Sequence, residues 1–317
     1  MPGPALNVAI VALPRCTLMV VGCIVDALRL ANRAAGRDLY SWSLVGLEPT
    51  ILSSAGVVLK ADRIIDDAGA GTPEVVIICG GLEAHRYVDR RVQAWLRVVD
   101  SHGAITGAVS TGVWMLAHAG LLDGKRCAVH WDEKPSFTAR FPRTEVRDEI
   151  FTHDGRRMTC SGGVAVVDMM LHLIAAQNGT ALADAVADLM IHASVRTSVA
   201  RQRPRERADS PGSGIVRRAV ALMEDHVEPV LAVEAIAARL GQSPRQLERL
   251  FGHAFGVPPK RYYDLIRLRR ARKLVTETDI PVTEIAIRCG YHSATQFSAA
   301  FKRAFGSPPR RVRSETR

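Results

Sequence analysis

The sequence predicts an α/β N-terminal domain, with a parallel sheet in a flavodoxin-like three-layer sandwich, followed by an all-α C-terminal domain with two helix-turn-helix units. Two observations support this prediction. Short apolar runs alternate with helical patterns in the first part of the chain, and one pattern of residues occurs twice in the last part. We expect the first domain at residues 1–195, a linker at residues 196–212 and the second domain at residues 213–317.

Several apolar runs in the first domain have the composition of buried strands. The clearest is Val75–Cys79, an unbroken apolar run that ends at Gly80 and Gly81. Helical patterns separate these runs, and unbroken apolar strands are typical of a parallel sheet that helices cover on both faces. The expected strands are residues 7–13, 42–47, 57–59, 75–79 and 104–109.

The repeat in the second domain starts at Ile236 and again at Ile285, 49 residues later (285 − 236). In each copy, apolar residues at helical spacing lead to a glycine, and a serine then caps a second helix. This order is typical of a helix-turn-helix unit. The matching residues are Ile236, Ala237, Gly241, Ser243, Gln246, Phe251, Phe255, Gly256, Pro258 and Pro259, and then Ile285, Ala286, Gly290, Ser293, Gln296, Phe301, Phe305, Gly306, Pro308 and Pro309.

Positive charge is concentrated in the same part of the chain. Residues 201–317 contain 23 Lys and Arg against 12 Asp and Glu, a net charge of +11, whereas residues 1–200 contain 19 and 20, a net charge of −1. A plain helical bundle does not require this asymmetry, but a protein that binds the phosphate backbone does. The repeat and the charge together predict a DNA-binding domain.

The second copy also carries the signature of a known family. Ile285–Ser293, followed by Phe305–Pro309, resembles the signature of AraC-type transcription regulators, and the similarity covers about residues 213–313. The resemblance implies that a long helix, here residues 261–277, joins the two units. Their recognition helices would enter successive turns of the major groove, about 34 Å apart.

The exposed faces of the two expected recognition helices carry side chains that can read bases. Arginine can donate two hydrogen bonds to a guanine edge, and glutamate can accept one from cytosine. The resemblance places base contacts at these helix positions and implies that the second helix reads fewer bases, because Ala294 and Ala299 stand where the family often has polar readers. The expected DNA contacts are Arg245, Glu248 and Arg249 in the first unit, and His292, Thr295, Gln296, Ser298 and, on a phosphate, Lys302 in the second.

The joining helix carries a dense basic run, for which we expect a solvated role for about half of the residues and phosphate contacts for the rest. The run consists of Arg267, Arg269, Arg270, Arg272 and Lys273.

In the first domain, a sharp strand-to-helix elbow is expected at residues 107–112, where the strand ending at Val109 meets the next helix. Ligands of parallel sheets bind at the carboxyl ends of strands. Three interpretations of Ser110 stay open. The first makes Ser110 a nucleophile with His130 as its base. The second makes Ser110 and Thr111 a helix cap, and the third makes Ser110 part of a ligand site formed by backbone N–H groups. No acid that would orient His130 is evident, which argues against the nucleophile.

This domain resembles a second family. The matching motifs are residues 78–81, the elbow, residues 119–124, His130–Trp131 and Ser161-Gly162-Gly163 leading into Asp168. They are similar to the PfpI-type, glutamine-amidotransferase-like domain, whose enzymes carry cysteine at the elbow. Ser110 stands at that position here, so the thiolate nucleophile is missing. With its AraC-type C-terminus, the chain resembles the GlxA subgroup of regulators. That resemblance implies a degenerate enzyme pocket that senses a small nitrogen metabolite such as arginine, carnitine or glycine betaine.

The expected effector site combines the elbow with the motifs that the resemblance places around it. Trp131 offers an aromatic wall for a cationic ligand, with Asp132 or Glu133 as a counter-charge. Trp114, at helical spacing, is better explained as core, and for His130 a pocket role and an ordinary hydrogen-bonded role are equally open. The expected site residues are Gly80, Gly81, Ser110, Thr111, His130 and Trp131.

Other features exclude several classes of protein. The six cysteines form no C-x-x-C pair, which indicates reduced thiols and no zinc site. No stretch approaches the ~18 consecutive apolar residues of a membrane span. We expect no cofactor and no metal.

The combined expectation is a cytoplasmic transcription activator, not an enzyme, that binds promoter DNA, a small-molecule effector and RNA polymerase. We expect a homodimer, with the helix at residues 181–193 either forming the dimer face or packing on its own sheet. The alternative is a hydrolase or amidotransferase-like enzyme with an attached DNA-binding module.

Overall fold

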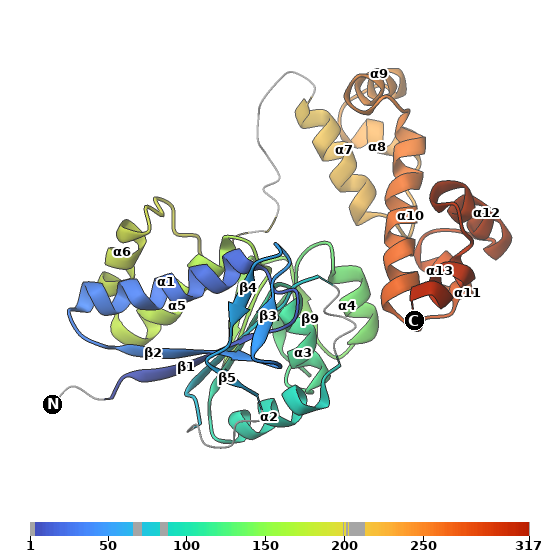
Figure 1. Cartoon of the computed structure of the whole chain (residues 1–317). Helices are drawn as coiled ribbons and strands as arrows, with labels where there is room; N and C mark the ends of the chain where they lie inside the picture. The colour runs from blue at the N-terminus through green and yellow to red at the C-terminus, as the bar shows by residue number, and fades with distance from the viewer. Residues whose placement is uncertain are drawn as a thin grey trace. The chain divides into compact units, whose positions relative to one another are not determined.

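The structure is a computed structural model that describes residues 4–65, 72–82, 88–198, 200, 202 and 213–316. Its contacts divide the chain into two compact units, residues 1–202 and residues 203–317 (Figure 1). The first unit is α/β and the second is all-α, which confirms both predicted fold classes. Most of the segment expected as a linker, residues 196–212, lies outside the described residues.

Among the described residues, seven strands form the main sheet of the first unit, in the order β10-β11-β7-β6-β1-β2-β5. Neighbouring strands are parallel except at one edge, where β10 pairs antiparallel with β11, so the predicted parallel sheet is confirmed. The strands are β1 (Leu6–Ala12), β2 (Tyr40–Gly46), β5 (Arg63–Ile64), β6 (Val75–Cys79), β7 (Ile105–Val109), β10 (Phe151–Asp154) and β11 (Arg157–Cys160). A separate parallel pair joins β8 (Arg126–Ala128) to β9 (Glu145–Arg147).

Successive residues of the central strands face opposite layers of helices. In β1, Val8 and Ile10 belong to one apolar core and Ala9 and Val11 to the other, and all four are fully buried. Because both faces are apolar, helices must cover both, as Figure 1 shows. One layer contains α1 (Leu18–Ala35), α5 (Ala165–Asn178) and α6 (Thr180–Leu189), and the other contains α2 (Arg90–Ser101), α3 (Val113–His118) and α4 (Lys134–Arg140).

The apolar face of α6 is used within the first unit. Ala183, Val186 and Ala187 are buried in the core that α6 shares with α1 and α5. Of the two roles expected for this helix, packing on its own unit is therefore the one observed for these residues. Leu189, at the end of the helix, is 41% exposed.

Two segments differ from the expected strands. The strand expected at residues 57–59 lies outside the main sheet, because β4 (Val58–Lys60) pairs antiparallel with β3 (Thr50–Leu52) in a hairpin of its own. The edge strand β10 and its neighbour β11 have no counterpart among the expected strands. Their buried positions include Thr152 and Thr159, whose hydroxyls hydrogen-bond to each other at 2.7 Å. Paired hydroxyls can be buried at low cost, so a search for apolar runs misses such strands.

The second unit is built of helices throughout its described part, residues 213–316, and the sequence repeat recurs in them. Two helix-turn-helix units and one long joining helix are present, as predicted. The first helix-turn-helix unit contains α7 (Ser213–Asp225), α8 (Val233–Arg239) and α9 (Pro244–Phe255). The joining helix α10 (Pro259–Glu277) follows, and then come α11 (Val282–Arg288), α12 (Ala294–Phe305) and α13 (Pro309–Thr316).

Local signals set the ends of the two recognition helices, α9 and α12. Ser243 caps α9 in a capping box with Gln246, and Ser293 caps α12 by accepting a backbone N–H bond. Both helices end at a glycine in the left-handed conformation, Gly256 at φ 68° and Gly306 at φ 79°. The same chemistry written twice in the sequence therefore produces two helices of equal length.

Candidate DNA-binding surface and effector site

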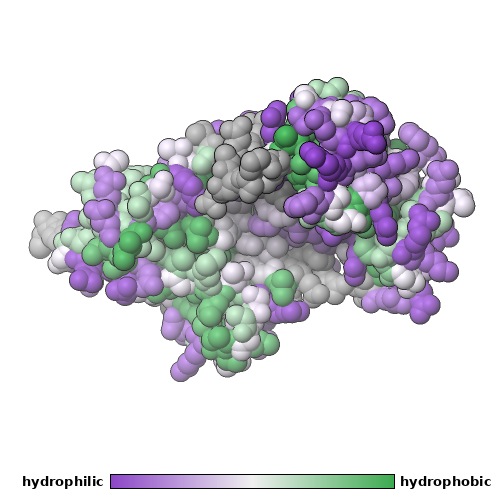
Figure 2. Space-filling view, turned by 90° about the horizontal axis from the view of Figure 1, so that it is seen from above, coloured by the Kyte–Doolittle hydropathy of each residue, from purple (hydrophilic) through white to green (hydrophobic). Residues whose placement is uncertain are grey.

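The first recognition helix, α9, has a buried side and a solvent side. Leu247 and Phe251 are fully buried against the other helices of the first helix-turn-helix unit. The expected base readers Arg245, Glu248 and Arg249 all lie on the exposed side. Figure 2 shows hydrophilic side chains gathered over the second unit. Long donor and acceptor side chains on a solvent-facing helix are what readout in the major groove requires.

The second recognition helix, α12, repeats this division with one difference. Phe297 and Phe301 are fully buried and hold the helix on the unit. Ser298 is half-buried, so it offers the least surface of the expected readers. The other expected contacts, in α12 or in the turn before it, are exposed: His292, Thr295, Gln296 and Lys302.

The basic residues of α10 divide into two groups. Arg267 is turned inward, with 11% of its side chain exposed. Arg270 is also largely shielded, and burial lowers the pKa of its guanidinium. Arg269 and Arg272 are exposed and can reach phosphates. Part of the run is therefore available to DNA, as expected, but the inward-facing residues pack inside the unit and do not form the solvated face that we expected.

In the first unit, the elbow has the geometry that its sequence predicts. β7 ends at Val109, a single 3₁₀ turn spans Ser110–Gly112, and α3 begins at Val113. Ser110 has a φ of 57°, in the left-handed region, which costs a non-glycine residue about 1–2 kcal/mol. Such strain persists only where the surrounding structure enforces it, and it is common at functional sites.

Glycines allow other segments to close around the elbow. A Cβ on Gly80 would lie 1.9 Å from the Gly112 nitrogen, and one on Gly162 would lie 3.0 Å from the Ser110 Cβ. A side chain is therefore excluded at Gly80, where backbone approaches backbone. At Gly162 a side chain would crowd the Ser110 side chain and be strained by the φ of 101°. The structure brings together four of the expected site residues, Gly80, Gly81, Ser110 and Thr111, and adds Gly162.

The other two expected residues, His130 and Trp131, lie in the loop after β8. Their ring centroids are 5.2 Å apart, and Trp131 is 42% exposed. His130 Nδ1 accepts a hydrogen bond of 3.3 Å from the Asp132 backbone N–H. This bond places the ring proton on Nε2, the reverse of the tautomer that a serine–histidine nucleophile pair requires.

Gln202 bonds to the His130–Trp131 loop, although its sequence context places it in the exposed linker. Its amide nitrogen donates to the carbonyls of Val129 at 2.7 Å and Glu149 at 3.0 Å, and its oxygen accepts from the Trp131 N–H at 2.8 Å. The end of the first unit is therefore tied to the His130–Trp131 loop. A single glutamine between arginines carries no sequence signal for such a role.

The cysteines beside the elbow do not replace the missing nucleophile. All six cysteines of the chain are free thiols, and all except Cys23 are buried. Burial raises the pKa of Cys160 to about 12 and also raises that of Cys79. Because the thiolate is the reactive form, these protonated thiols are poor nucleophiles.

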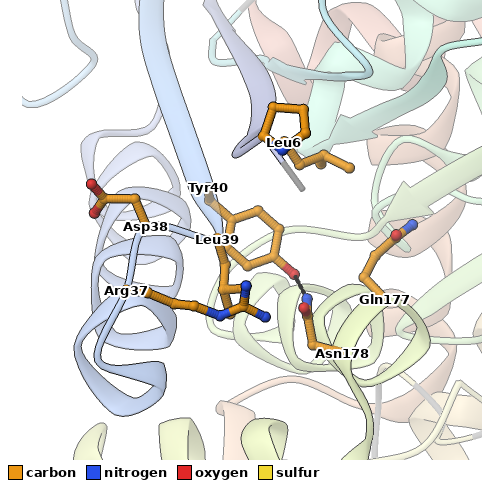
Figure 3. Close-up of a pocket in the computed structure, with 8 residues that line it drawn as sticks. Leu6, Arg37, Asp38, Leu39, Tyr40, Gln177 and Asn178 are labelled. Atoms are coloured by element: carbon orange, nitrogen blue, oxygen red, sulfur yellow. Dashed lines mark hydrogen bonds between the residues drawn. The ribbon is translucent and has the colours of Figure 1, made fainter. Parts of the chain in front are cut away.

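A pocket lies where β1 and β2 begin. Figure 3 shows Tyr40 and Asn178 pointing toward each other in a cavity of about 190 Å³, which Arg37 and Asp38 also line. Asn178 Nδ2 donates to the Tyr40 hydroxyl at 2.7 Å, and burial raises the pKa of Tyr40 to about 12. This pocket lies where β2 begins, whereas the elbow lies at the carboxyl end of β7. The elbow is therefore the better candidate for the effector site.

Comparison with known proteins identifies both units. One family model, described as a helix-turn-helix domain, matches residues 236–315, and another, described as the DJ-1/PfpI family, matches residues 16–176. The HTH-type transcriptional regulator GbdR of Pseudomonas aeruginosa is 37% identical over 306 residues, which cover 96% of this chain and 83% of that protein. The HTH-type transcriptional regulator GlxA of Rhizobium meliloti is 35% identical over 302 residues, covering 93% and 92%. The chain belongs to this family of transcriptional regulators.

A solved structure supports the fold of the first unit of this regulator. A crystal structure of an AraC family transcriptional regulator from Pseudomonas putida matches with a TM-score of 0.53 and 23% identity, and covers 58% of this chain and 99% of that one. At this identity the likeness establishes the fold alone. Function follows from the curated relatives, which are named as regulators and so support a regulatory role.

Two kinds of site are not found in the described residues of the regulator. Within those residues, none of the helices combines the length and the apolar character needed to cross a membrane. In the same part of the chain, no cluster of three or more His, Cys, Asp and Glu side chains is arranged to hold a metal ion.

Proposed function

We propose that this regulator activates transcription when a small nitrogen-containing metabolite binds at the elbow of its first unit. The effector is an amino acid or quaternary amine such as arginine, carnitine or betaine. The regulator works in the cytoplasm as a homodimer, without enzymatic activity, and contacts RNA polymerase at the promoter. The observation that carries the effector proposal is the Ser110 backbone. It keeps the strained φ of 57° although the cysteine that such an elbow serves in related enzymes is replaced.

The elbow and the His130–Trp131 loop would together suit a ligand with a carboxylate and a cationic nitrogen. The half-buried hydroxyl of Ser110, with the backbone N–H groups of the turn, can bind a carboxylate, whereas the Thr111 hydroxyl donates to the Gly81 carbonyl. Trp131 presents its ring to solvent and can stack on a cationic amine, while Asp132 and Glu133 beside it supply negative charge. The base contacts are made by the exposed residues of α9 and α12 described above.

Gln202 supports a route from the effector to DNA. A ligand controls an equilibrium only if it binds two arrangements with different affinity. Gln202 joins the Trp131 backbone to the Glu149 carbonyl at the point where the chain leaves the first unit. A ligand that reorders the His130–Trp131 loop therefore changes how the exit of the chain is held. In the dimer, this changes which pairs of half-sites both DNA-binding domains can occupy.

Thermal unfolding of the full-length protein against amino acids, betaines, carnitine and polyamines tests the effector site. A ligand present at 100 times its dissociation constant stabilises the folded state by about 2.7 kcal/mol. We expect one chemical class to raise the Tm, and Trp131→Ala to abolish that shift. Val98→Ala, at an exposed position of α2, is the matched control and should keep it. If no compound shifts the Tm, the elbow is not an effector site. The role left to Thr111 is then structural, but it is not the expected helix cap, because the N-cap positions are Val109 and Gly112 and the Thr111 hydroxyl donates to the Gly81 carbonyl.

The strained elbow also favours a second candidate function, hydrolysis at Ser110, because nucleophile elbows of α/β enzymes have the same backbone. The tautomer of His130 argues against it, since Nε2 carries the proton. Ser110→Ala separates the two functions. Loss of p-nitrophenyl ester or glutamine hydrolysis with operator binding intact would establish an enzyme. No hydrolysis by the wild-type protein would exclude it.

A further inference from the structure

The two helix-turn-helix units contact each other at the turn of the second unit. Gly290, the glycine of that turn, has a φ of 73°. A Cβ at this position would lie 2.3 Å from Val230 Cγ2 and 2.6 Å from the Val227 carbonyl oxygen. Val227 and Val230 belong to the loop that leads from α7 into α8 of the first helix-turn-helix unit. Only glycine fits between them, so the turn of one unit packs on a loop of the other.

Arg267 of α10 holds the same turn from the other side. Its Nε donates to the Cys289 carbonyl at 2.8 Å and its Nη2 donates to the Gly290 carbonyl. These carbonyls follow α11, where the helix leaves acceptors without intrahelical partners. The planar guanidinium binds two of them at once through donors of fixed geometry, which a lysine ammonium on its flexible stem does not provide. Nη1 pairs with Asp264 at 3.1 Å, which fixes the orientation of the group.

The contacts of Arg267 extend through Tyr291 to α12, the second recognition helix. The Arg267 guanidinium lies 4.2 Å above the centre of the Tyr291 ring. That ring packs against Phe297 of α12, with centroids 5.3 Å apart, and Phe297 is fully buried. The position of α12 therefore depends on a chain of packed groups that begins at α10.

Tyr263 lies one helical turn before Arg267 on α10 and binds the α7–α8 loop of the first helix-turn-helix unit. Residues four apart on a helix share a face. The Tyr263 hydroxyl donates to the His226 carbonyl and accepts from the Leu231 N–H at 3.3 Å. His226 and Leu231 flank the loop that packs on Gly290. Tyr263 is 3% exposed, so this bond is shielded from water.

We propose that Tyr263, Arg267 and Gly290 form a joint that sets the half-site spacing accepted by the two recognition helices. A single joining helix leaves each unit free to tilt about its own contact with that helix. The joint removes this freedom, because a second contact links the units directly. Its members are positioning residues and act without touching DNA. The inference rests on DNA binding alone and is independent of the effector.

Binding to operators of different spacing tests the joint. An operator is first selected from random duplex DNA with the wild-type protein, and one base pair is then inserted or removed between its half-sites. This moves one half-site by about 3.4 Å and turns it by about 35°. We expect the wild-type protein to bind altered spacings at least about tenfold more weakly than the selected one. For Gly290→Ala and Arg267→Met we expect weaker binding to the selected operator and a spacing ratio reduced to about threefold or less.

Two matched variants control for strain and charge. Gly241→Ala places alanine at the equivalent turn of the first helix-turn-helix unit. There φ is 66°, and beyond the adjoining residues no atom lies within 4 Å of the added Cβ. Arg269→Met removes an exposed charge from α10. Both should weaken binding by the same factor at every spacing and so keep the wild-type ratio.

Tyr263→Phe, which removes only the hydroxyl, and Arg267→Lys extend the test if Gly290→Ala fails to fold by circular dichroism. Both should also reduce the spacing ratio, Arg267→Lys by less than Arg267→Met. The joint is refuted if Arg267→Met and Tyr263→Phe are folded and discriminate spacing as the wild-type protein does.

Discussion

Replacing Asp168 by asparagine should loosen the segment through which the chain leaves the first unit. The Asp168 carboxylate is fully buried and accepts hydrogen bonds from the Arg196 backbone N–H at 2.7 Å and from its guanidinium at 2.7 and 3.1 Å. His192 Nε2 lies 3.0 Å from Oδ1, the oxygen that also accepts from the Arg196 backbone N–H. Asparagine keeps the shape of the side chain but replaces one acceptor oxygen by a donor that faces these donors.

The expected loss in free energy of unfolding is about 2–3 kcal/mol. Breaking a fully buried ion pair costs about 3–5 kcal/mol, because it leaves an uncompensated charge in the interior. Arg196 keeps 37% of its side chain in solvent and can turn outward, which lowers the cost. Asp26→Asn is the matched control. Its pair with Arg29 is about half exposed on both sides, so its loss should cost less than about 1 kcal/mol.

Urea titration of the full-length protein, followed by tryptophan fluorescence, measures this loss. All four tryptophans, Trp42, Trp95, Trp114 and Trp131, lie in the first unit, so the signal reports on that unit alone. At unchanged slope, a lower midpoint for Asp168→Asn than for Asp26→Asn is the expected result. Equal midpoints for the two variants would refute the argument that the buried carboxylate anchors Arg196 and the exit segment.

The other predictions concern strain, protonation, base readout and coupling. Ser110→Gly relieves the left-handed φ and should raise the free energy of unfolding by about 1 kcal/mol in the same titration; a decrease would mean that the serine side chain holds the elbow. Burial, and then the charge of Arg140, lowers the pKa of His118, so the unfolded chain takes up a proton first as pH falls through about 6.5 and stability is lost below that pH. His118→Phe should remove this part of the loss, so that urea midpoints at about pH 7 and about pH 5 differ less than in the wild-type protein; an unchanged difference would assign the loss to other groups. Arg249→Ala should cost about 1–3 kcal/mol at one base position in competition among operator variants, and a uniform loss over all sequences would make Arg249 a phosphate contact. Gln202→Ala should keep effector binding and operator affinity but reduce the coupling between them, typically about 1–3 kcal/mol; full coupling in this variant would exclude the route through Gln202.

A strand of the sheet could be predicted where its buried residues form an unbroken apolar run in the sequence. Val75–Cys79 is buried at every position, and its run of five apolar residues marks both ends of β6. The hairpin of β10 and β11 could not be predicted in the same way. Thr152 and Thr159 are buried because each hydroxyl finds the other, and that pairing exists only after the strands have met.

The candidate sites divide along the same line. The exposed side of α9 could be predicted because the capping serine and the helical period determine which residues face solvent. Gln202 and Arg267 could not be assigned, because their partners are remote: Gln202 bonds to a carbonyl 73 residues away and Arg267 to one 22 residues away. Neither residue differs in local context from its charged and polar neighbours.

The sequence by itself therefore determined what depends on neighbours along the chain: the alternation of strands and helices, the caps, the turn glycines, the charge of the second unit and the position of the strand-to-helix elbow. Tertiary structure alone decided which polar side chains form hydrogen bonds inside the protein. Arg267 and Arg269 are two residues apart on one helix, yet the first is bound to carbonyls and the second faces water. A donor's role depends on the acceptors that folding brings to it, and an unsatisfied carbonyl at the end of a distant helix leaves no mark near the arginine that satisfies it.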